Sequence, residues 1–312
     1  MNFDGKTAIV TGGAGFLGSH LVDKLLELGV KVTVVDMMSA DNPKKLSHAT
    51  DRIKLINADV SDYKNLETLE PADFIFHLAA YAVPNLCEKN PDAAFKSNVL
   101  GTHNILKFAL ETSAKKFVFP SSALLYGKHP KYLPIDENHP IEITSVYNAT
   151  KKFGEDLCKY AIENHNLSVT YFRLFNSFGP RQDTDYFIPT VIVQALRQKK
   201  VEIWNAEPTR DFTFVHDTAK AFIKAAGSDF SGGPINIGSG IELKTGVIAK
   251  LIAEKLDAEV EILNKPVSGS MRLSCNNSLA KELIGWEPQV KFEDGIEETI
   301  KWFIHNKQTF EK

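Results

Sequence analysis

The sequence predicts an α/β fold in which a doubly wound parallel sheet carries a smaller, partly interleaved C-terminal α/β domain. Short β-branched or apolar runs alternate with stretches of helical periodicity through the first half of the chain, and a glycine-rich turn joins the first run to the first helix. Such alternation is typical of βαβ units, whose parallel strands are covered by helices on both faces. After about Leu174 the rhythm becomes irregular and prolines separate shorter elements, which indicates a second domain.

The predicted elements follow in chain order. Six strands are expected at residues 7–10, 32–35, 53–56, 74–77, 117–120 and 169–174. The first helix is expected from Phe16 to about Leu28, with an apolar stripe of Leu17, Leu21, Leu25 and Leu28 and a stop at Gly29. Two later helices are expected near 246–256 and 295–305. We predict a first domain over 1–174 and a second over 175–312, with segments of the second crossing back to the first.

Composition excludes several classes of function. The 312 residues include 43% hydrophobic and 24% charged residues, enough for a large core, and the net charge of -3 gives no basic surface for nucleic acid. Cys87, Cys158 and Cys275 are too far apart for a metal knuckle or a disulfide framework, so no metal site and a reducing cytoplasm are expected. No signal peptide and no apolar run of about 20 residues is visible, so a membrane partner is not expected.

Three glycines lie between the first strand and the first helix. Gly12, Gly15 and Gly18 are spaced G-x-x-G-x-x-G. In this context they allow a tight turn, a close approach of backbone to a pyrophosphate and close helix packing, while the helix N-terminus faces the phosphate charge.

An acidic residue supports the same interpretation. Asp36 ends the second predicted strand, where a carboxylate can accept hydrogen bonds from both ribose hydroxyls. Met37 and Met38 follow, and neither Arg nor Lys is there to accept a 2′-phosphate. The pattern predicts a Rossmann-type site that takes NAD rather than NADP.

A series of ordered motifs covers nearly the whole chain, and with them the sequence resembles the NAD-dependent epimerase/dehydratase family, the extended short-chain dehydrogenases that modify nucleotide sugars. The motifs are TGGAGFLG, Asp59-Val60, His77-Leu78-Ala79-Ala80, Asn98 in SNVLGT, SSALLYG at 121–127, Tyr147-x-x-x-Lys151, RLFNSFGPRQ at 173–182 and RDFTFVHD at 210–217. Within the family, the chain resembles the nucleotide-sugar 4-epimerases.

Tyr147 and Lys151 are the predicted catalytic pair. They are four residues apart at the start of a predicted helix, so both side chains project from one face. Oxidation of a sugar hydroxyl needs a base, and a nearby ammonium lowers the pKa of a tyrosine. The resemblance implies that Lys151 also holds the nicotinamide ribose, that Ser122 is the catalytic hydroxyl beside the sugar, and that Ser121 serves the cofactor.

The resemblance implies the remaining site residues as well. Those expected to bind NAD are Gly12, Gly15, Phe16, Leu17, Gly18, Asp36, Asp59, Val60, Leu78, Ala79, Ala80, Asn98, Ser121, Tyr147 and Lys151. Those expected to bind a nucleotide diphosphate sugar are Ser122, Tyr147, Asn176, Arg181, Arg210 and Arg272. His77 is interpreted as a core histidine. A departure from the family follows Arg272, where Cys275-Asn276-Asn277 replaces the usual aspartate motif and leaves asparagine to make the capping contacts.

The reaction is predicted from what is missing beside the catalytic serine. Dehydratases of the family carry Asp-Glu there and decarboxylases a glutamate, whereas this chain has Ala123 and Leu124. A 4-epimerase that oxidises the sugar transiently at C4 is therefore expected. A 4-dehydrogenase that releases the keto sugar stays open, and a silent NAD-binding regulatory protein is disfavoured by the complete Ser-Tyr-Lys set. The resemblance also implies a homodimer through helices near 92–112 and 148–165.

Overall fold

A parallel sheet of seven strands forms the body of the protein in the computed structural model, which describes residues 2–37, 45–267 and 269–309. The strands lie in the order β10-β6-β5-β4-β1-β2-β3, and every neighbouring pair is parallel. Their bounds are β1 (Thr7–Thr11), β2 (Lys31–Asp36), β3 (Ile53–Asn57), β4 (Phe74–His77), β5 (Lys116–Ser122), β6 (Val169–Leu174) and β10 (Gly232–Ile237). All six predicted strands are confirmed, and the order reverses direction between β1 and β4.

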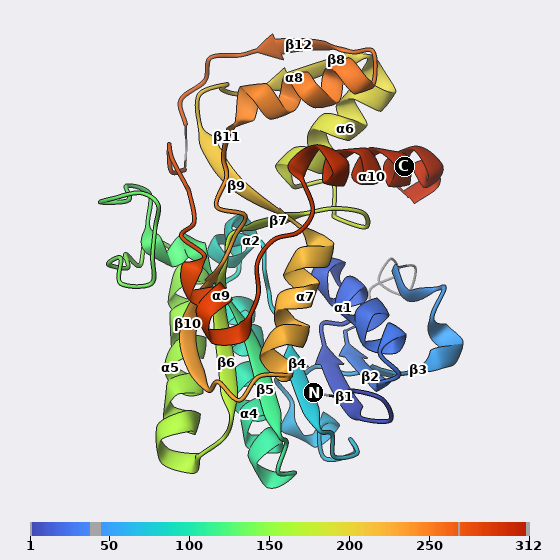
Figure 1. Cartoon of the computed structure of the whole chain (residues 1–312), viewed down its shortest axis with the longest axis vertical. Coiled ribbons are helices and arrows are strands. Elements are labelled where there is room, and N and C mark those ends of the chain that lie inside the picture. The colour runs from blue at the N-terminus through green and yellow to red at the C-terminus, as the bar shows by residue number, and fades with distance from the viewer. Residues whose placement is uncertain (1, 38–44, 268, 310–312) are drawn as a thin grey trace.

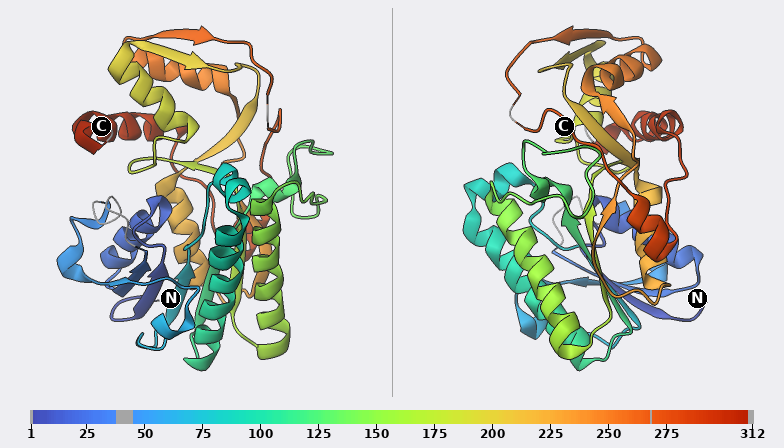
Figure 2. Two further views of the ribbon diagram at one scale, coloured as in Figure 1. Left: turned by 180° about the vertical axis from the view of Figure 1, so that it is seen from behind. Right: turned by 60° about the vertical axis from the view of Figure 1, so that its left-hand side comes forward.

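Helices cover both faces of this sheet, as Figures 1 and 2 show. One face carries α1 (Phe16–Glu27), α7 (Val215–Ala226) and α9 (Ser278–Ile284), and the other carries α4 (Gly101–Glu111) and α5 (Val146–His165). The short helices α2 (Pro84–Lys89), α3 (Pro91–Phe95) and the π-helical η4 (Lys96–Leu100) lead into α4. The doubly wound Rossmann-type fold is thus confirmed.

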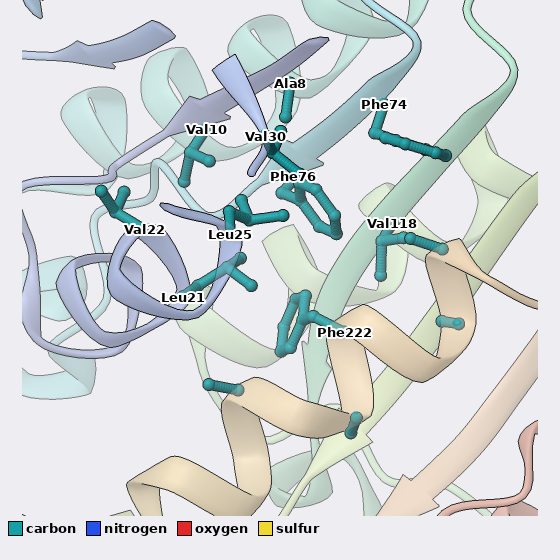
Figure 3. Close-up of a cluster of buried hydrophobic side chains, with 14 of the residues drawn as sticks. Ala8, Val10, Leu21, Val22, Leu25, Val30, Phe74, Phe76, Val118 and Phe222 are labelled. Atoms are coloured by element: carbon teal, nitrogen blue, oxygen red, sulfur yellow. The ribbon is translucent and has the colours of Figure 1, made fainter. Parts of the chain in front are cut away.

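Strand alternation divides the core between the two faces. Val10 of β1 packs with Leu21 of α1 and Phe222 of α7, whereas Ile9 points to the other face and packs with Ile105 of α4. Figure 3 shows the first of these clusters, in which Leu21, Leu25 and Phe222 meet side chains of the sheet. The predicted leucine stripe is wrong at Leu28, which lies beyond the end of α1 and is exposed, because the chain turns away at Gly29 with a φ of 76°.

A smaller lobe lies above the large sheet in Figure 1. It contains the sheet β11-β9-β7, the pair β12-β8 and three helices. Their bounds are β7 (Asn176–Phe178), β8 (Lys200–Ile203), β9 (Thr209–Phe214), β11 (Glu242–Lys244), β12 (Glu259–Ile262), α6 (Phe187–Gln198), α8 (Thr245–Lys255) and α10 (Phe292–His305). The two helices predicted in this half correspond to α8 and α10, and α10 begins three residues earlier than expected.

The chain leaves the large sheet at Leu174 and returns to it twice. After β9, α7 packs on α1 and β10 pairs with β6, and after β12, α9 packs beside β10. The two lobes are therefore interleaved, which places a cleft between them at the carboxyl ends of the parallel strands. No helix in the described ranges is both long and apolar enough to cross a bilayer.

Candidate active site

A cleft of about 870 Å³ lies between the sheet and the smaller lobe. Its floor is formed where β1, β2, β4 and β5 end, next to the point at which the strand order reverses, and its other wall comes from the start of α6 and from β9. Open parallel sheets bind ligands at such a reversal, because the loops that leave neighbouring strands there diverge to opposite faces.

The glycine turn is built for close contact. Gly12 has a φ of 67°, and a Cβ atom at this position would lie 2.6 Å from the backbone nitrogen of Ala79. A Cβ on Gly18 would overlap the carbonyl oxygen of Gly12. Gly15 is the N-cap of α1, and no side chain caps that helix, so its free N–H groups and its dipole face the cleft.

Two aspartates line the same part of the cleft. Asp36 ends β2, and its Oδ2 accepts a hydrogen bond from the backbone nitrogen of Ala14 at 2.9 Å. Asp59 accepts hydrogen bonds from the backbone and the hydroxyl of Ser61. Burial alone would raise the pKa of Asp59, but these bonds and Lys96 bring it below its usual value, so the carboxylate stays charged. Met37 also lines the cleft, and Met38 lies outside the described residues.

The other residues predicted to contact the cofactor, apart from Asn98 and those of β5 and α5, also line the cleft. Phe16, Leu17, Val60, Leu78, Ala79 and Ala80 all line the cleft. His77 does not: its two ring nitrogens contact the hydroxyls of Thr11 and Thr102 at 2.7 and 3.0 Å, and burial lowers its pKa to about 3. His77 is thus a neutral core histidine, as predicted.

Asn98 lies behind the cleft wall. Its Oδ1 accepts from the backbone nitrogen of Tyr81, and its Nδ2 donates to the Tyr81 carbonyl and to Thr150 of α5. Asn98 is buried and does not line the cleft, whereas its neighbour Ser97 does. The structure therefore shows Asn98 positioning the Tyr81 segment, and its predicted role at the cofactor stays a prediction.

Tyr147 and Lys151 lie on the first turns of α5, which begins after its N-cap Ser145. Both side chains are buried and line the cleft together with Ser121 and Ser122. The Nζ of Lys151 donates to the carbonyl of Pro120 at 2.9 Å, and burial lowers the pKa of Lys151 to about 8. The four predicted residues are thus brought together from β5 and α5.

Two neighbouring groups influence the ionisation of Tyr147. Burial raises the pKa of Tyr147, and the Ser122 hydroxyl acts in the opposite direction through a hydrogen bond. The Nζ of Lys151 is 5.9 Å from the centre of the Tyr147 ring and donates to the carbonyl of Pro120. Ser122 therefore favours the phenolate by hydrogen bonding, and the role predicted for the Lys151 ammonium stays a prediction.

The substrate-side predictions divide into two groups. Asn176 and Arg210 line the cleft: Asn176 donates to the carbonyl of Asp211 at 3.2 Å, and Arg210 donates to the carbonyls of Thr209 and Ser270 at 2.7 Å. Burial lowers the pKa of Arg210, so the protein holds a desolvated cation there.

Arg181 and Arg272 are not in the cleft. Arg181 has a φ of 64° and turns toward α1, where its Nη2 is 2.7 Å from Asp23. Arg272 is exposed and binds Glu242 through both Nε and Nη2. The structure thus places each arginine in an ion pair outside the cleft, and the diphosphate contact predicted for them stays a prediction.

The asparagines that follow Arg272 make local contacts before α9. Asn276 accepts from the backbone and the hydroxyl of Ser278 at the start of α9, and Asn277 donates to the carbonyl of Gly238. Asn277 is the N-cap residue of α9, but its side chain makes no capping hydrogen bond.

Several residues that line the cleft escaped sequence reasoning. Most of them come from two segments outside the quoted motifs and from two single positions, namely Tyr81, Ala82, Val83, Pro84 and Leu86; Asp183, Asp185, Tyr186, Phe187 and Ile188; and Thr245 and Leu273. Tyr186 lies near enough to Tyr147 to raise its pKa electrostatically. The only local signal at Tyr186 is an aromatic residue before a predicted helix, which does not show where the side chain points.

Comparison with known proteins decides the family. The model of the "NAD dependent epimerase/dehydratase family" matches residues 8–238, which include the glycine turn, both serines and the Tyr-Lys pair. The chain belongs to this family.

Relatives within the family catalyse different reactions. The chain is 31% identical to the "Putative UDP-glucose 4-epimerase" of Methanocaldococcus jannaschii, covering 96% of this chain and 99% of that one. It is 32% identical to "UDP-glucuronic acid decarboxylase 1" of Xenopus tropicalis, covering 96% and 72%. Among solved structures, the UDP-N-acetylglucosamine 4-epimerase from Methanobrevibacter ruminantium in complex with UDP-N-acetylmuramic acid is similar, with a TM-score of 0.91 and 31% identity over 97% and 99% of the chains.

The cleft of this epimerase/dehydratase family member fits the NAD on which the family depends. Gly12 and Gly18 leave no room for side chains where the turn approaches, α1 presents free N–H groups, and Asp36 provides a carboxylate at the end of β2. The buried hydroxyl of Ser121 has no hydrogen-bond partner among the described residues, as expected for a group that a ligand satisfies. The protein is thus an NAD-dependent enzyme of the extended short-chain dehydrogenase type.

Proposed function

We propose that this protein is an NAD-dependent nucleotide-sugar 4-epimerase. The observation that carries the proposal is the wall of the cleft around Ser122 and Tyr147, where the next two positions are Ala123 and Leu124. This wall offers a hydroxyl and a phenol for moving a proton at a sugar hydroxyl, and the two positions after Ser122 offer no carboxylate for a second proton transfer.

The residues of the glycine turn, Asp36, Asp59 and Val60 would hold the adenosine and pyrophosphate of the cofactor, with Ser121 and Lys151 at its nicotinamide end. When bound, NAD accepts a hydride from C4 of the sugar and returns it. Asn176 and Arg210 would hold the nucleotide diphosphate, because a buried guanidinium with few competing partners binds phosphate oxygens strongly.

Tyr147 would take the proton from the C4 hydroxyl and later give it back. Burial keeps the phenol protonated, and the hydrogen bond from Ser122 lowers the cost of forming the phenolate. Ser122 can donate to the same sugar oxygen as its charge changes, which stabilises the transition state. The 4-keto sugar can then receive hydride on either face, so that one product is the C4 epimer.

The positions of the other acidic residues also argue against a dehydratase, which would need a carboxylate to eliminate water from the sugar. The carboxylates that line the described cleft are Asp36, Asp59, Asp183 and Asp185, none of which adjoins Ser122 in the chain. Glu137 accepts a hydrogen bond from the backbone nitrogen of Asn236, and Asp136 accepts one from the hydroxyl of Tyr132. Neither carboxylate lines the cleft.

The test supplies UDP-, GDP-, CDP- and dTDP-hexoses, and UDP-glucuronic acid, to the NAD-loaded enzyme in heavy water. The expected outcome is a C4 epimer of unchanged mass with no deuterium at C5. Loss of 18 mass units with deuterium uptake would show a dehydratase, and loss of carbon dioxide from UDP-glucuronic acid would show a decarboxylase. Accumulation of NADH with a released keto sugar would favour the 4-dehydrogenase, which uses the same Tyr147 and Ser122.

A further inference from the structure

A second cavity, of about 610 Å³, lies between α1 and α10. In Figure 1 these two helices lie on the same side of the molecule, with the upper end of α7 beside them. The cavity is lined by α1, by the Pro180–Arg181 turn, by His216 at the start of α7, by α10, and by His48 and Arg52. It shares no lining residue with the cleft.

Positive charge exceeds negative charge around this cavity. Its lining includes the cations Lys24, Arg52, Arg181 and Lys301 and the carboxylates Asp23, Glu27 and Glu298. Two cations are already paired, Lys24 with Glu27 and Arg181 with Asp23, each at 2.7 Å. Arg52 and Lys301 make no salt bridge with any residue in the described part of the chain, so their charges are available to a ligand.

The inner wall of the cavity contains a hydrogen-bond donor that has no acceptor among the described residues. Arg181 donates through Nη2 to Asp23, but its buried Nη1 has no hydrogen-bond partner within the described ranges. His20 is buried beside it, with its Nε2 2.8 Å from the carbonyl of Pro180 and its ring 5.1 Å from that of His216. An unpaired N–H on a buried guanidinium is costly, and an oxygen-rich anion is the ligand that satisfies it.

The shape and chemistry of the lining narrow the ligand class. A volume of about 610 Å³ exceeds that of a single phosphate and suits a small organic molecule. Trp302 of α10 lines the cavity and is only partly buried, so its ring can pack against a sugar or a base. The described His, Asp and Glu side chains form no group that could hold a metal ion.

We propose that this cavity binds a small phosphorylated molecule. Its phosphate lies among Arg52, Arg181 and Lys301, and its sugar or base lies against Trp302. The site is separate from the cleft, although α1 reaches both: Phe16 and Gly18 line the cleft, and His20 and Lys24 line the cavity.

Calorimetric titration of the NAD-saturated protein tests this proposal with three probes: inorganic phosphate, ribose 5-phosphate and AMP. We expect one equivalent of ribose 5-phosphate or AMP to bind, and the tighter of the two identifies the source as a sugar phosphate or a nucleotide. The double variant Arg52→Gln/Lys301→Gln should bind it at least tenfold more weakly with unchanged thermal unfolding and basal turnover. Arg210→Gln, which alters the cleft, should bind it as the wild type does.

A second double variant that also removes one arginine and one lysine is the control for this binding experiment. Arg197→Gln/Lys250→Gln removes the same two residue types at exposed positions outside both cavities and should bind the probe normally. The proposal is overturned if no organic phosphate binds, if the Arg52/Lys301 variant binds like the wild type, or if the control pair loses affinity equally. Equal affinity for inorganic phosphate would overturn the contact assigned to Trp302.

Discussion

Tyr147 and Lys151 have opposite pKa shifts from the same cause. Burial disfavours the charged form of each side chain, which raises the pKa of the phenol and lowers that of the ammonium to about 8. The phenol therefore stays protonated near neutral pH, whereas the ammonium remains mostly charged there. Ser122 is the neighbour that moves Tyr147 back toward the phenolate.

Replacing Tyr147 by Phe removes the proton-transfer group and little else. We expect kcat to fall by roughly 10²- to 10⁴-fold with NAD affinity and folding nearly intact, because the ring still fills its site. Steady-state turnover and NAD titration measure the two effects. Tyr160→Phe, at an exposed position on the same helix, is the control and should leave kcat unchanged. A loss of less than a few-fold in Tyr147→Phe would assign the base to another residue.

Lys151→Met should change how stability depends on pH. The pKa of Lys151 falls from 10.5 to about 8 on folding, so the burial penalty is complete below pH 8 and is relieved as the pH rises toward 10.5. The free energy of unfolding of the wild type should therefore increase relative to that of the variant between these values. Urea unfolding at pH 7, 8, 9 and 10 measures the difference.

The control for this experiment is Lys159→Met, an exposed lysine on α5. Its stability difference from the wild type should stay constant over the same pH range. If the Lys151→Met difference were equally flat, the ammonium would not be desolvated.

Asp36→Ala tests the cofactor preference. The substitution removes a carboxylate from the cleft and also its bond to Ala14, so NAD binding should weaken by about 1–3 kcal/mol while NADP binding stays the same or improves. Fluorescence titration with both cofactors measures the change, with the exposed Asp51→Ala as control. Equal affinity of the unmutated protein for NAD and NADP would contradict the role given to Asp36.

At the scale of elements, the cleft depends on how closely α1 approaches the end of β1. Gly18 lies in the first turn of α1, directly against the carbonyl of Gly12, and this turn carries the free N–H groups. The spacing between helix and strand is therefore as important for ligand binding as any side chain in the turn.

Gly18→Ala should push α1 away from this turn. Because the added Cβ meets backbone rather than a flexible side chain, we expect a loss of about 1–3 kcal/mol in the free energy of unfolding and a larger loss of NAD affinity than of stability. Chemical unfolding and NAD titration measure both. Gly227→Ala is the matched control, since its Cβ would make only ordinary van der Waals contacts, with the Phe3 ring at 3.4 Å and the Ile223 carbonyl at 3.5 Å. Wild-type NAD affinity in Gly18→Ala would show that the turn is not packed against the helix.

For the whole molecule, the helical face of α3, η4 and α5 has unusual apolar exposure. Phe95, Leu100, Phe153 and Tyr160 are each 40–55% exposed, and the rings of Phe95 and Phe153 lie 6.1 Å apart. This is the face on which the homodimer was predicted, with two helical segments from each copy.

Phe153→Glu should convert such a dimer to a monomer, because a carboxylate would be buried without a partner at the centre of the face. Light scattering coupled to size-exclusion chromatography should give twice the chain mass for the wild type and the chain mass for the variant. Trp204→Glu changes an even more exposed aromatic residue on the smaller lobe and should leave the mass unchanged. A monomeric wild type would refute the dimer.

The sequence by itself determined the large sheet, the glycine turn and the grouping of Ser121, Ser122, Tyr147 and Lys151 near one cleft. The sheet, the glycine turn and the Tyr147–Lys151 pair rest on short-range signals: the alternation of strands with helices, a helix start, and side chains spaced four apart on one helix face. The family resemblance joined Ser121 and Ser122 to this pair. The return of β10 to the sheet edge had no such signal, because its neighbour β6 is about 60 residues away in the chain.

Only the tertiary structure decided which distant side chains share the cleft. Tyr186 and Leu273 enter it because α6 and the 269–276 segment pack over the strand ends, whereas Arg181 leaves it for Asp23 on α1 and Arg272 leaves it for Glu242. A motif can place an arginine on a loop, but its direction depends on the backbone φ and on which carboxylate the packing brings within reach. The partner of each arginine is far away in the sequence, so it is decided only by how the two lobes pack together.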